Sequence, residues 1–280
     1  MANAKKKPDK AQDQQRRQAA ARAEAERLKA AQAAKERRTK LIAVAAAVVV
    51  VIAVAVAVVL VLRGSNKSSY EDVTRPLGGS EAGAIVVGQD LAAGGAPAEG
   101  DDVVVVRIYS DYMCPGCGSV ERRLGAKLEE LTASGDIKLE LQSVAYLNRF
   151  SQGTEYSTRA ANATATVAAL APEQYLAFHS KLYESGVQPE ESTEGLTDER
   201  LVELAQEVGV PESVTSQFAE RKYESWVDYA TTQAQDFGVG GTPSIWVGKS
   251  DSDLTQITDT SSLNLDAVIA AVRAGDNPNG

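Results

Sequence analysis

The chain is poor in the residue types that hold most metal sites and most hydrolase sites. Its 280 residues include two cysteines, one histidine and two methionines. A secreted domain stapled by disulfides needs more cysteines, and tetrahedral zinc needs about four ligands. His179 is the single histidine of the chain, so a hydrolase with a Cys–His or Ser–His pair is disfavoured. We therefore expect no metal and no other cofactor, and the search for chemistry narrows to Cys114 and Cys117.

The two cysteines stand three positions apart, between a predicted strand and a predicted helix. Residues 103–110 are a β-branched apolar run that indicates a buried strand. Cys114 then falls at the start of the helix, where unpaired N–H groups and the helix dipole favour a thiolate. Cys117 is close enough to form a disulfide with it, and Pro115 suits the first helical turn. The helix itself is predicted from apolar residues at helical spacing: Val120, Leu124, Leu128 and Leu131.

The net charge of −9 conceals two parts of opposite sign. Residues 1–40 carry 13 Lys/Arg and 5 Asp/Glu, whereas residues 41–280 carry 16 and 33. Residues 41–62 contain no charged or polar side chain, and a helix of this length spans roughly 33 Å, enough for a bilayer core. We predict a single uncleaved transmembrane helix here, with the basic tail in the cytoplasm and the rest of the chain outside. A cleaved signal peptide and a buried soluble helix are the alternatives, but the apolar region of a signal peptide is usually shorter.

The remaining chain is predicted to form one domain on a tether. Residues 63–82, rich in Gly and Ser, are predicted to be a flexible linker. The domain then covers 83–280, beginning with a short apolar run at 84–87 that we expect to pair as an edge strand with the 103–110 strand. A second core strand is expected within 136–147. A helical region follows at about 154–236, with helices predicted over 154–171, around 175–182, over 197–208 and over 211–237.

A glycine-rich segment leads into a proline near the C-terminal end of the domain. Gly241 and Thr242 precede Pro243 and a predicted strand at 244–247. Proline at a strand entrance cannot donate to the ladder, and an X-Pro bond in such a segment is a candidate for the cis form, with a trans turn as the alternative. A last helix is predicted over 265–274, and His179 is expected to be a packing or surface residue.

These motifs together resemble the DsbA-like branch of the thioredoxin superfamily, in particular its membrane-anchored actinobacterial members. The resemblance rests on the strand with Cys114-Pro-Gly-Cys117 and on the segment with Thr242-Pro243, and it covers about residues 83–275. It implies an α/β thioredoxin fold with an inserted helical domain, which the helical region at 154–236 fits.

The resemblance also assigns roles to residues. Cys114 corresponds to the exposed nucleophile and Cys117 to the buried resolving thiol, with Pro115 and Gly116 between them. Pro243 corresponds to the cis-proline that faces the disulfide. Thr242, with Gly241 beside it, corresponds to the residue whose backbone pairs with a bound substrate strand.

The sequence departs from this family in two places. Strongly oxidising members have histidine where this chain has Gly116, which predicts a milder oxidant. Many members have a buried carboxylate six residues before the first cysteine, where this chain has Ile108. In this chain, Asp111 or a water molecule would have to carry protons to and from Cys117 in place of that carboxylate.

The favoured function is that of a membrane-anchored thiol–disulfide oxidoreductase acting on exported proteins through Cys114 and Cys117. The resemblance implies a quinone-linked membrane oxidase as the partner that restores the disulfide. A reductase or isomerase using the same site is one alternative. A second is a non-catalytic, anchored module that binds client proteins and has structural cysteines, and a third is delivery of a soft metal ion with help from Met113. The pKa of Cys114 separates an oxidoreductase, of whichever direction, from the binding module and from metal delivery, because a low pKa is expected for the oxidoreductase and one near 8.5 or higher for an inert thiol.

Overall fold

The computed structural model describes residues 27, 49 and 70–280. The predicted tail (1–40) and membrane span (41–62) lie outside the described residues, apart from one position in each. No helix within the described part of the chain is both long and apolar enough to cross a membrane. The chain divides into two units, 1–66 and 67–280, and the second unit contains the sheet and the two cysteines.

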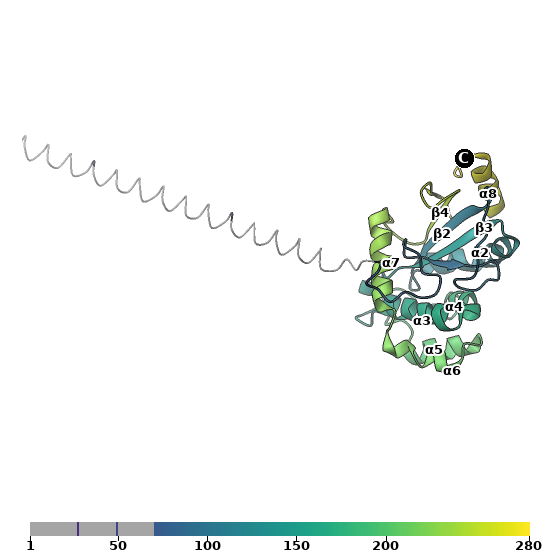
Figure 1. Ribbon diagram of the computed structural model, residues 1–280. Coiled ribbons are helices and arrows are strands. Elements are labelled where there is room, and N and C mark those ends of the chain that lie inside the picture. The colour runs from purple at the N-terminus through teal and green to yellow at the C-terminus, as the bar shows by residue number, and fades with distance from the viewer. Residues whose placement is uncertain (1–26, 28–48, 50–69) are drawn as a thin grey trace, which may run out of the picture. The chain divides into compact units, whose positions relative to one another are not determined.

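The second unit is built on a five-stranded mixed sheet in the order β1-β3-β2-β4-β5 (Figure 1). β2 and β3 run parallel and are joined by helix α2 (Pro115–Ser134), while the other neighbouring pairs are antiparallel. All seven residues of β2 are buried, as expected for a central strand covered on both faces. The strands are β1 (Ile85–Val87), β2 (Val104–Ser110), β3 (Ile137–Ser143), β4 (Ser244–Gly248) and β5 (Thr255–Gln256).

The edge strand does not pair as the sequence suggested. β1 pairs antiparallel with β3, with Ile85 opposite Leu141, and has no contact in the ladder with β2. The parallel connection through α2 places β3 directly against β2, and β4 occupies the other side of β2. Because both edges of β2 are then filled, the only place left for β1 on this side is the outer edge of β3.

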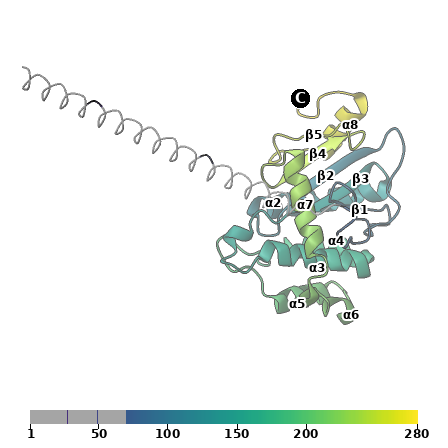
Figure 2. The same ribbon diagram turned by 60° about the vertical axis from the view of Figure 1, so that its left-hand side comes forward.

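Helices cover the sheet on both faces (Figure 2). On one face, α2 and the last helix, α8 (Leu265–Ala274), share the core with Val106 and Ile108. On the other face, α7 (Glu224–Phe237) packs against the sheet, where Tyr109 contributes to a cluster with Ala234. The loop that follows α7 therefore enters β4 at the end of the sheet where β2 leads into Cys114.

The predicted helical region forms a layer beyond the end of the sheet (Figures 1 and 2). Its helices are α3 (Tyr156–Leu170), α4 (Tyr175–Leu182), α5 (Asp198–Glu207) and α6 (Glu212–Thr215), and α7 connects it back to the sheet. α3 is buried over almost its whole length, which its small Ala and Thr side chains permit. The single helix predicted over 211–237 is wrong: Arg221 has a left-handed backbone (φ 50°) and separates a short 3₁₀ turn (Phe218–Glu220) from α7.

Part of the predicted linker belongs to the folded unit. Val73 is buried in a cluster with Trp226 and Tyr229 of α7, and the Tyr229 hydroxyl donates a hydrogen bond to the carbonyl of Glu81. The folded unit therefore begins at least ten residues before the predicted boundary at 83. The composition of this segment is typical of a linker, but its few aromatic and branched residues are enough to anchor it on α7.

Candidate active site

Cys114 lies at the junction of β2 and α2, as the sequence predicts. It is the residue before the first helical turn, in an extended conformation (φ −80°, ψ 115°), and Pro115 begins the helix. The Cys114 carbonyl accepts a hydrogen bond from the Cys117 backbone N–H at 3.0 Å. The first turn of α2 thus places both side chains at the same helix end, and both cysteines are free thiols in this structure.

The nucleophile expected to be exposed is largely enclosed. Cys114 is 7 % exposed and Cys117 is 2 % exposed, so the two thiols differ less in burial than expected. The Cys114 thiol donates a hydrogen bond to the Thr242 carbonyl at 3.3 Å, and the loop carrying Thr242 covers it. Cys114 still lines an open cavity.

The two thiols have opposite acidities. A hydrogen bond from the Cys117 thiol lowers the pKa of Cys114 to about 6, against the opposing effect of burial, and the Thr242 side chain and the backbone N–H groups of Cys117 and Gly116 add to the lowering. Burial raises the pKa of Cys117 well above its usual range. Since the thiolate is the reactive form, these opposite shifts of the pKa favour reaction at Cys114 rather than at Cys117 near neutral pH.

This difference predicts a pH profile for alkylation. In the reduced protein, the rate at which iodoacetamide modifies Cys114 should rise through a midpoint near pH 6, because the thiolate forms above the pKa. Cys117→Ala removes the largest cause of the lowered pKa, so its midpoint should move upward. Peptide mass mapping follows each site, and the unfolded protein, with a midpoint of about 8.5, is the control. A midpoint of about 8.5 in the folded protein would contradict the assignment.

The Thr242-Pro243 peptide bond is cis, which confirms the sequence expectation. A Cβ atom added to Gly116 would lie 2.9 Å from Cδ of Pro243 and 3.7 Å from Sγ of Cys114. The proline loop can approach the first turn of α2 this closely because residue 116 has no side chain. Gly116 therefore affects the Cys114 thiol in two ways: it lets the loop with Thr242 and Pro243 come close, and it provides no imidazole that could carry a charge.

This contact alters what a substitution at Gly116 is expected to do. Gly116→Ala should displace the Thr242 loop from Cys114, raise the pKa of Cys114 by about half a unit to one unit, and lower the reduction potential by up to roughly 30 mV. Gly116→His adds an imidazole donor to the same displacement, so its difference from Gly116→Ala isolates the contribution of the imidazole, which should lower the pKa. Thiolate absorbance and a glutathione equilibrium measure both quantities. An alanine variant identical to the wild type would show that the close contact does not support the thiolate.

Gln188 forms a hydrogen bond with the turn at the start of α2. Nothing in the sequence indicated this contact. The Gln188 side-chain amide donates to the carbonyl of Cys114 at 2.8 Å and faces the carbonyl of Tyr112 at 3.4 Å. Gly118 makes room for it, because a Cβ there would lie 1.9 Å from the Gln188 side-chain oxygen. Gln188 comes from the loop after α4, so the helical region holds the turn that carries Cys114.

Asp111 is a buried carboxylate three residues before Cys114, whereas many members of the family have theirs six residues before the first cysteine, where this chain has Ile108. Its side-chain oxygens accept hydrogen bonds from the backbone N–H groups of Met113 and Leu147, both at 2.9 Å, and from the Ser157 hydroxyl at 2.7 Å. Its own N–H donates to Cys117 Sγ at 3.5 Å. Burial raises the pKa of Asp111 despite these three donors. The carboxylate thus joins the cysteine turn, the loop after β3 and the start of α3.

His179 packs under the site rather than lining it. It is 2 % exposed; its Nδ1 is 2.8 Å from the Tyr112 hydroxyl, and its Nε2 is 3.6 Å from a Glu121 oxygen. Tyr112 lies two residues before Cys114 and stacks on Tyr183. This confirms the expectation of a packing residue, although one bonded to polar neighbours. Among the described residues, no group of three or more His, Cys, Asp or Glu side chains is arranged to hold a metal.

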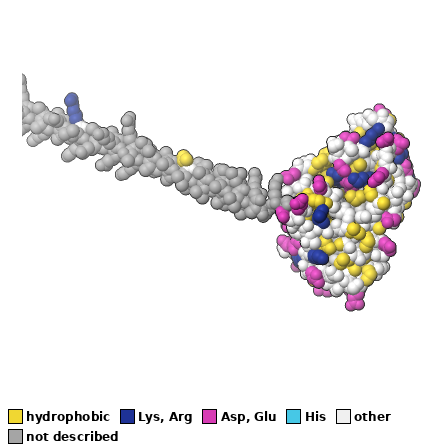
Figure 3. Space-filling model, in the orientation of Figure 1, with side chains coloured by type: hydrophobic (Ala, Val, Ile, Leu, Met, Phe, Trp, Pro, Cys, Tyr) yellow, Lys and Arg dark blue, Asp and Glu magenta, His cyan; other side chains and the backbone are white. Residues whose placement is uncertain are grey.

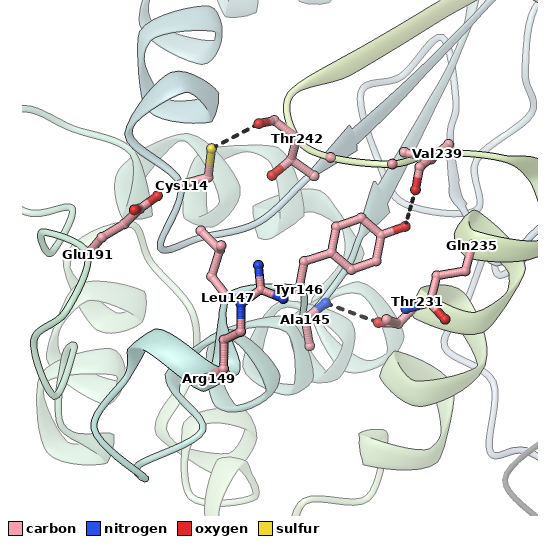
Figure 4. A pocket seen from close by; sticks show the side chains of 12 residues that line it. Cys114, Ala145, Tyr146, Leu147, Arg149, Glu191, Thr231, Gln235, Val239 and Thr242 are labelled. Atoms are coloured by element: carbon pink, nitrogen blue, oxygen red, sulfur yellow. Dashed lines mark hydrogen bonds between the residues drawn. The ribbon is translucent and has the colours of Figure 1, made fainter. Parts of the chain in front are cut away.

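A cavity of about 510 Å³ opens beside Cys114 (Figure 4). Gly241 and Thr242 form one wall, as the sequence suggested, and the loop after β3 forms another. The Tyr146 hydroxyl donates to the Val239 carbonyl at 2.9 Å, which ties these two walls together. The lining residues that the sequence did not indicate are Ala145, Tyr146, Leu147, Arg149, Glu191, Thr231, Gln235, Val239 and Gly240.

Comparisons with known proteins agree with this geometry. A family model described as thioredoxin matches residues 95–266, more than half of the chain. The reduced disulfide oxidoreductase DsbG of Mycobacterium tuberculosis is 32 % identical, with 62 % of this chain and 79 % of that chain covered and a TM-score of 0.52. The oxidised DsbA of the same organism is 30 % identical, with 70 % and 94 % covered and a TM-score of 0.55. BdbD of Bacillus subtilis, 22 % identical with 72 % and 98 % covered and a TM-score of 0.56, supports the fold alone.

The chain belongs to the thioredoxin family. Within it, the structural relatives identify the chain as a DsbA-like thiol–disulfide oxidoreductase. A curated relative of another kind is the serine/threonine-protein kinase PknE of Mycobacterium tuberculosis, which is 30 % identical over 154 residues. That match covers 51 % of this chain and 26 % of the kinase, so the chain spans about a quarter of the length of the curated relatives it matches.

Proposed function

We propose that this protein exchanges disulfides with exported proteins through Cys114 and Cys117 while anchored in the cell membrane. The observation that carries the proposal is the pair of opposed acidities at one helix end: burial raises the pKa of Cys117, while the pKa of Cys114 is lowered to about 6. Such a pair has one reactive sulfur beside a cavity and one protected sulfur behind it.

In the oxidised protein, a client thiolate attacks Sγ of Cys114. The Cys114–Cys117 bond breaks, a mixed disulfide with Cys114 forms, and Cys117 takes up the displaced electron pair and then a proton. A second client thiolate attacks the client sulfur of the mixed disulfide and releases Cys114 as a thiolate. The client leaves with a disulfide, and the protein keeps both electrons as a dithiol.

The lowered pKa of Cys114 favours net oxidation, because it stabilises the reduced protein relative to its disulfide. Restoring the disulfide needs an acceptor for two electrons, and we propose a quinone-linked membrane oxidase for this step. A reductase or an isomerase would use the same atoms in another order. A structural disulfide in a binding module needs no acidic thiol, and the lowered pKa of Cys114 argues against that alternative.

The test is a single-turnover reaction with the full-length protein in detergent. Oxidised protein is mixed with a reduced dithiol peptide, quenched in acid and alkylated, and thiols are counted by mass. We expect the peptide to lose two thiols as Cys114 and Cys117 gain two. A peptide that stays reduced while the Cys114–Cys117 disulfide stays intact would sink the proposal.

The proposed location rests on the uncharged residues 41–62 and the basic residues before them. The N-terminal tail is then cytoplasmic and the catalytic domain extracytoplasmic. Protease added to intact spheroplasts should digest residues 70–280 and spare residues 1–40. A protected catalytic domain would place it on the wrong side of the membrane for exported clients.

A further inference from the structure

One cation lines the cavity beside Cys114. Arg149 belongs to the short 3₁₀ turn Asn148–Phe150 and is exposed to solvent. Figure 4 shows its side chain reaching into the cavity from the same wall as Leu147. Its guanidinium carbon lies 4.7 Å from the centre of the Phe150 ring, and this stacking limits the directions in which the guanidinium can point.

Arg149 has no anionic partner within the described part of the chain. Of the other arginines of the folded unit, five form ion pairs with carboxylates: Arg107, Arg159, Arg200, Arg221 and Arg273. Arg122 and Arg123 donate to backbone carbonyls and Arg75 lies over the Tyr70 ring, but none of these three lines the cavity beside Cys114. Residues 41–280 carry 33 Asp/Glu against 16 Lys/Arg, and acidic side chains outnumber basic ones on the face drawn in Figure 3. An unpaired arginine in such a domain, directed into the reaction cavity, is free to bind an anion that a ligand brings.

We propose that Arg149 selects client segments that carry an Asp or Glu side chain close to the reacting cysteine. This rests on the proposed function, because it names the class of client that the same cavity takes. Guanidinium is planar and matches a carboxylate with two parallel hydrogen bonds. The client sulfur is fixed by its bond to Cys114, and its carboxylate binds across the cavity at Arg149.

Glu191 limits a bound client segment to one acidic side chain, placed on the Arg149 side of the cavity. It lines the same cavity, and no ion pair joins it to Arg149 among the described residues. Figure 4 shows it beside Cys114, away from the wall that carries Arg149. A second client carboxylate near Glu191 would be repelled, so the two charges give the cavity a direction as well as a preference.

The experiment uses one dithiol peptide with Glu, Gln or Lys placed in turn at each of the three positions on either side of the reacting cysteine. The full-length oxidised protein in detergent is reduced by each peptide in single turnover. Rates are divided by those of the same peptides with oxidised glutathione, which removes differences in the intrinsic reactivity of the peptide thiol. At one or two positions we expect Glu to react about two- to fivefold faster than Gln, and Lys slower than Gln, with the advantage fading in 1 M salt.

Two variants assign this preference to a residue. Arg149→Gln should abolish the preference for Glu, measured as the ratio of the Glu and Gln peptide rates with that same variant, whereas Arg149→Lys should keep part of it. Glu191→Gln is the matched variant: it should retain the preference for Glu at the positions that face Arg149, and it should remove any disadvantage of Glu at the positions that face Glu191. Equal rates for Glu and Gln peptides at every position, or a preference that survives in Arg149→Gln, would overturn this inference alone. Failure of every peptide to reduce the wild-type disulfide would overturn the proposed function, and the inference with it.

Discussion

Cys117→Ala is expected to accumulate mixed disulfides with exported proteins through Cys114, whereas Cys114→Ala should accumulate none. The reason lies in the order of the steps. Cys114 is acidic, with a pKa of about 6, and lines the cavity, whereas Cys117 is 2 % exposed. Without Cys117, the Cys114 thiolate can still attack a disulfide of a client, which forms a mixed disulfide and releases the client's other sulfur as a thiolate. No internal thiol then releases the client, so the mixed disulfide persists until a client thiol attacks it.

The measurement is a non-reducing gel of cells treated with acid and then with a thiol-blocking reagent, in which trapped adducts appear as bands that collapse on reduction. The double variant lacking both cysteines is the control for adducts formed elsewhere, and the chain has no third cysteine to confuse the result. Equal trapping by both single variants would remove the distinction between nucleophile and resolving thiol. Trapping by Cys114→Ala alone would reverse it.

The local chemistry of the site follows from short sequence patterns. The apolar run of β2, the helical spacing of α2 and the position of Cys114 between them are enough to place the thiol at a helix N-terminus. The structure bears this out with Pro115 as the first residue of α2. The cis peptide bond before Pro243 could also be predicted from the sequence, because cis bonds in proteins occur almost only before proline.

What the sequence could not supply depends on contacts between distant segments. Gln188 lies 74 residues from Cys114 and donates to its carbonyl, but an isolated glutamine in a loop has no periodic pattern to reveal it. Gly116 suggested only a missing imidazole, and its contact with Pro243 appears once both segments have folded. The pairing of β1 with β3 likewise depends on which strand edge the α2 crossover leaves free.

The hydrogen bonds of Asp111 likewise depend on distant segments that meet only in the fold. The sequence offered it as a substitute for the family carboxylate, on the proton path to Cys117. In the structure its carboxylate accepts from Met113, Leu147 and Ser157, three donors in three separate segments. Leu147 and Cys114 both line the cavity, so the bonds to Asp111 set the distance between the cavity wall and the turn that carries the nucleophile.

Asp111→Ala is expected to lower the free energy of unfolding by at least about 3 kcal/mol, because it leaves buried donors without an acceptor and each costs roughly 1–3 kcal/mol. Asp111→Asn keeps the shape but turns an amide NH₂ toward at least one of these donors, and we expect it to recover only part of the loss. Ser157→Ala removes a single donor and is the matched control, at about 1 kcal/mol. Urea unfolding of the reduced proteins measures all three. An Asp111→Ala variant within about 0.5 kcal/mol of the wild type would mean that water replaces the carboxylate at no cost, and that the three segments are held together by their packing instead.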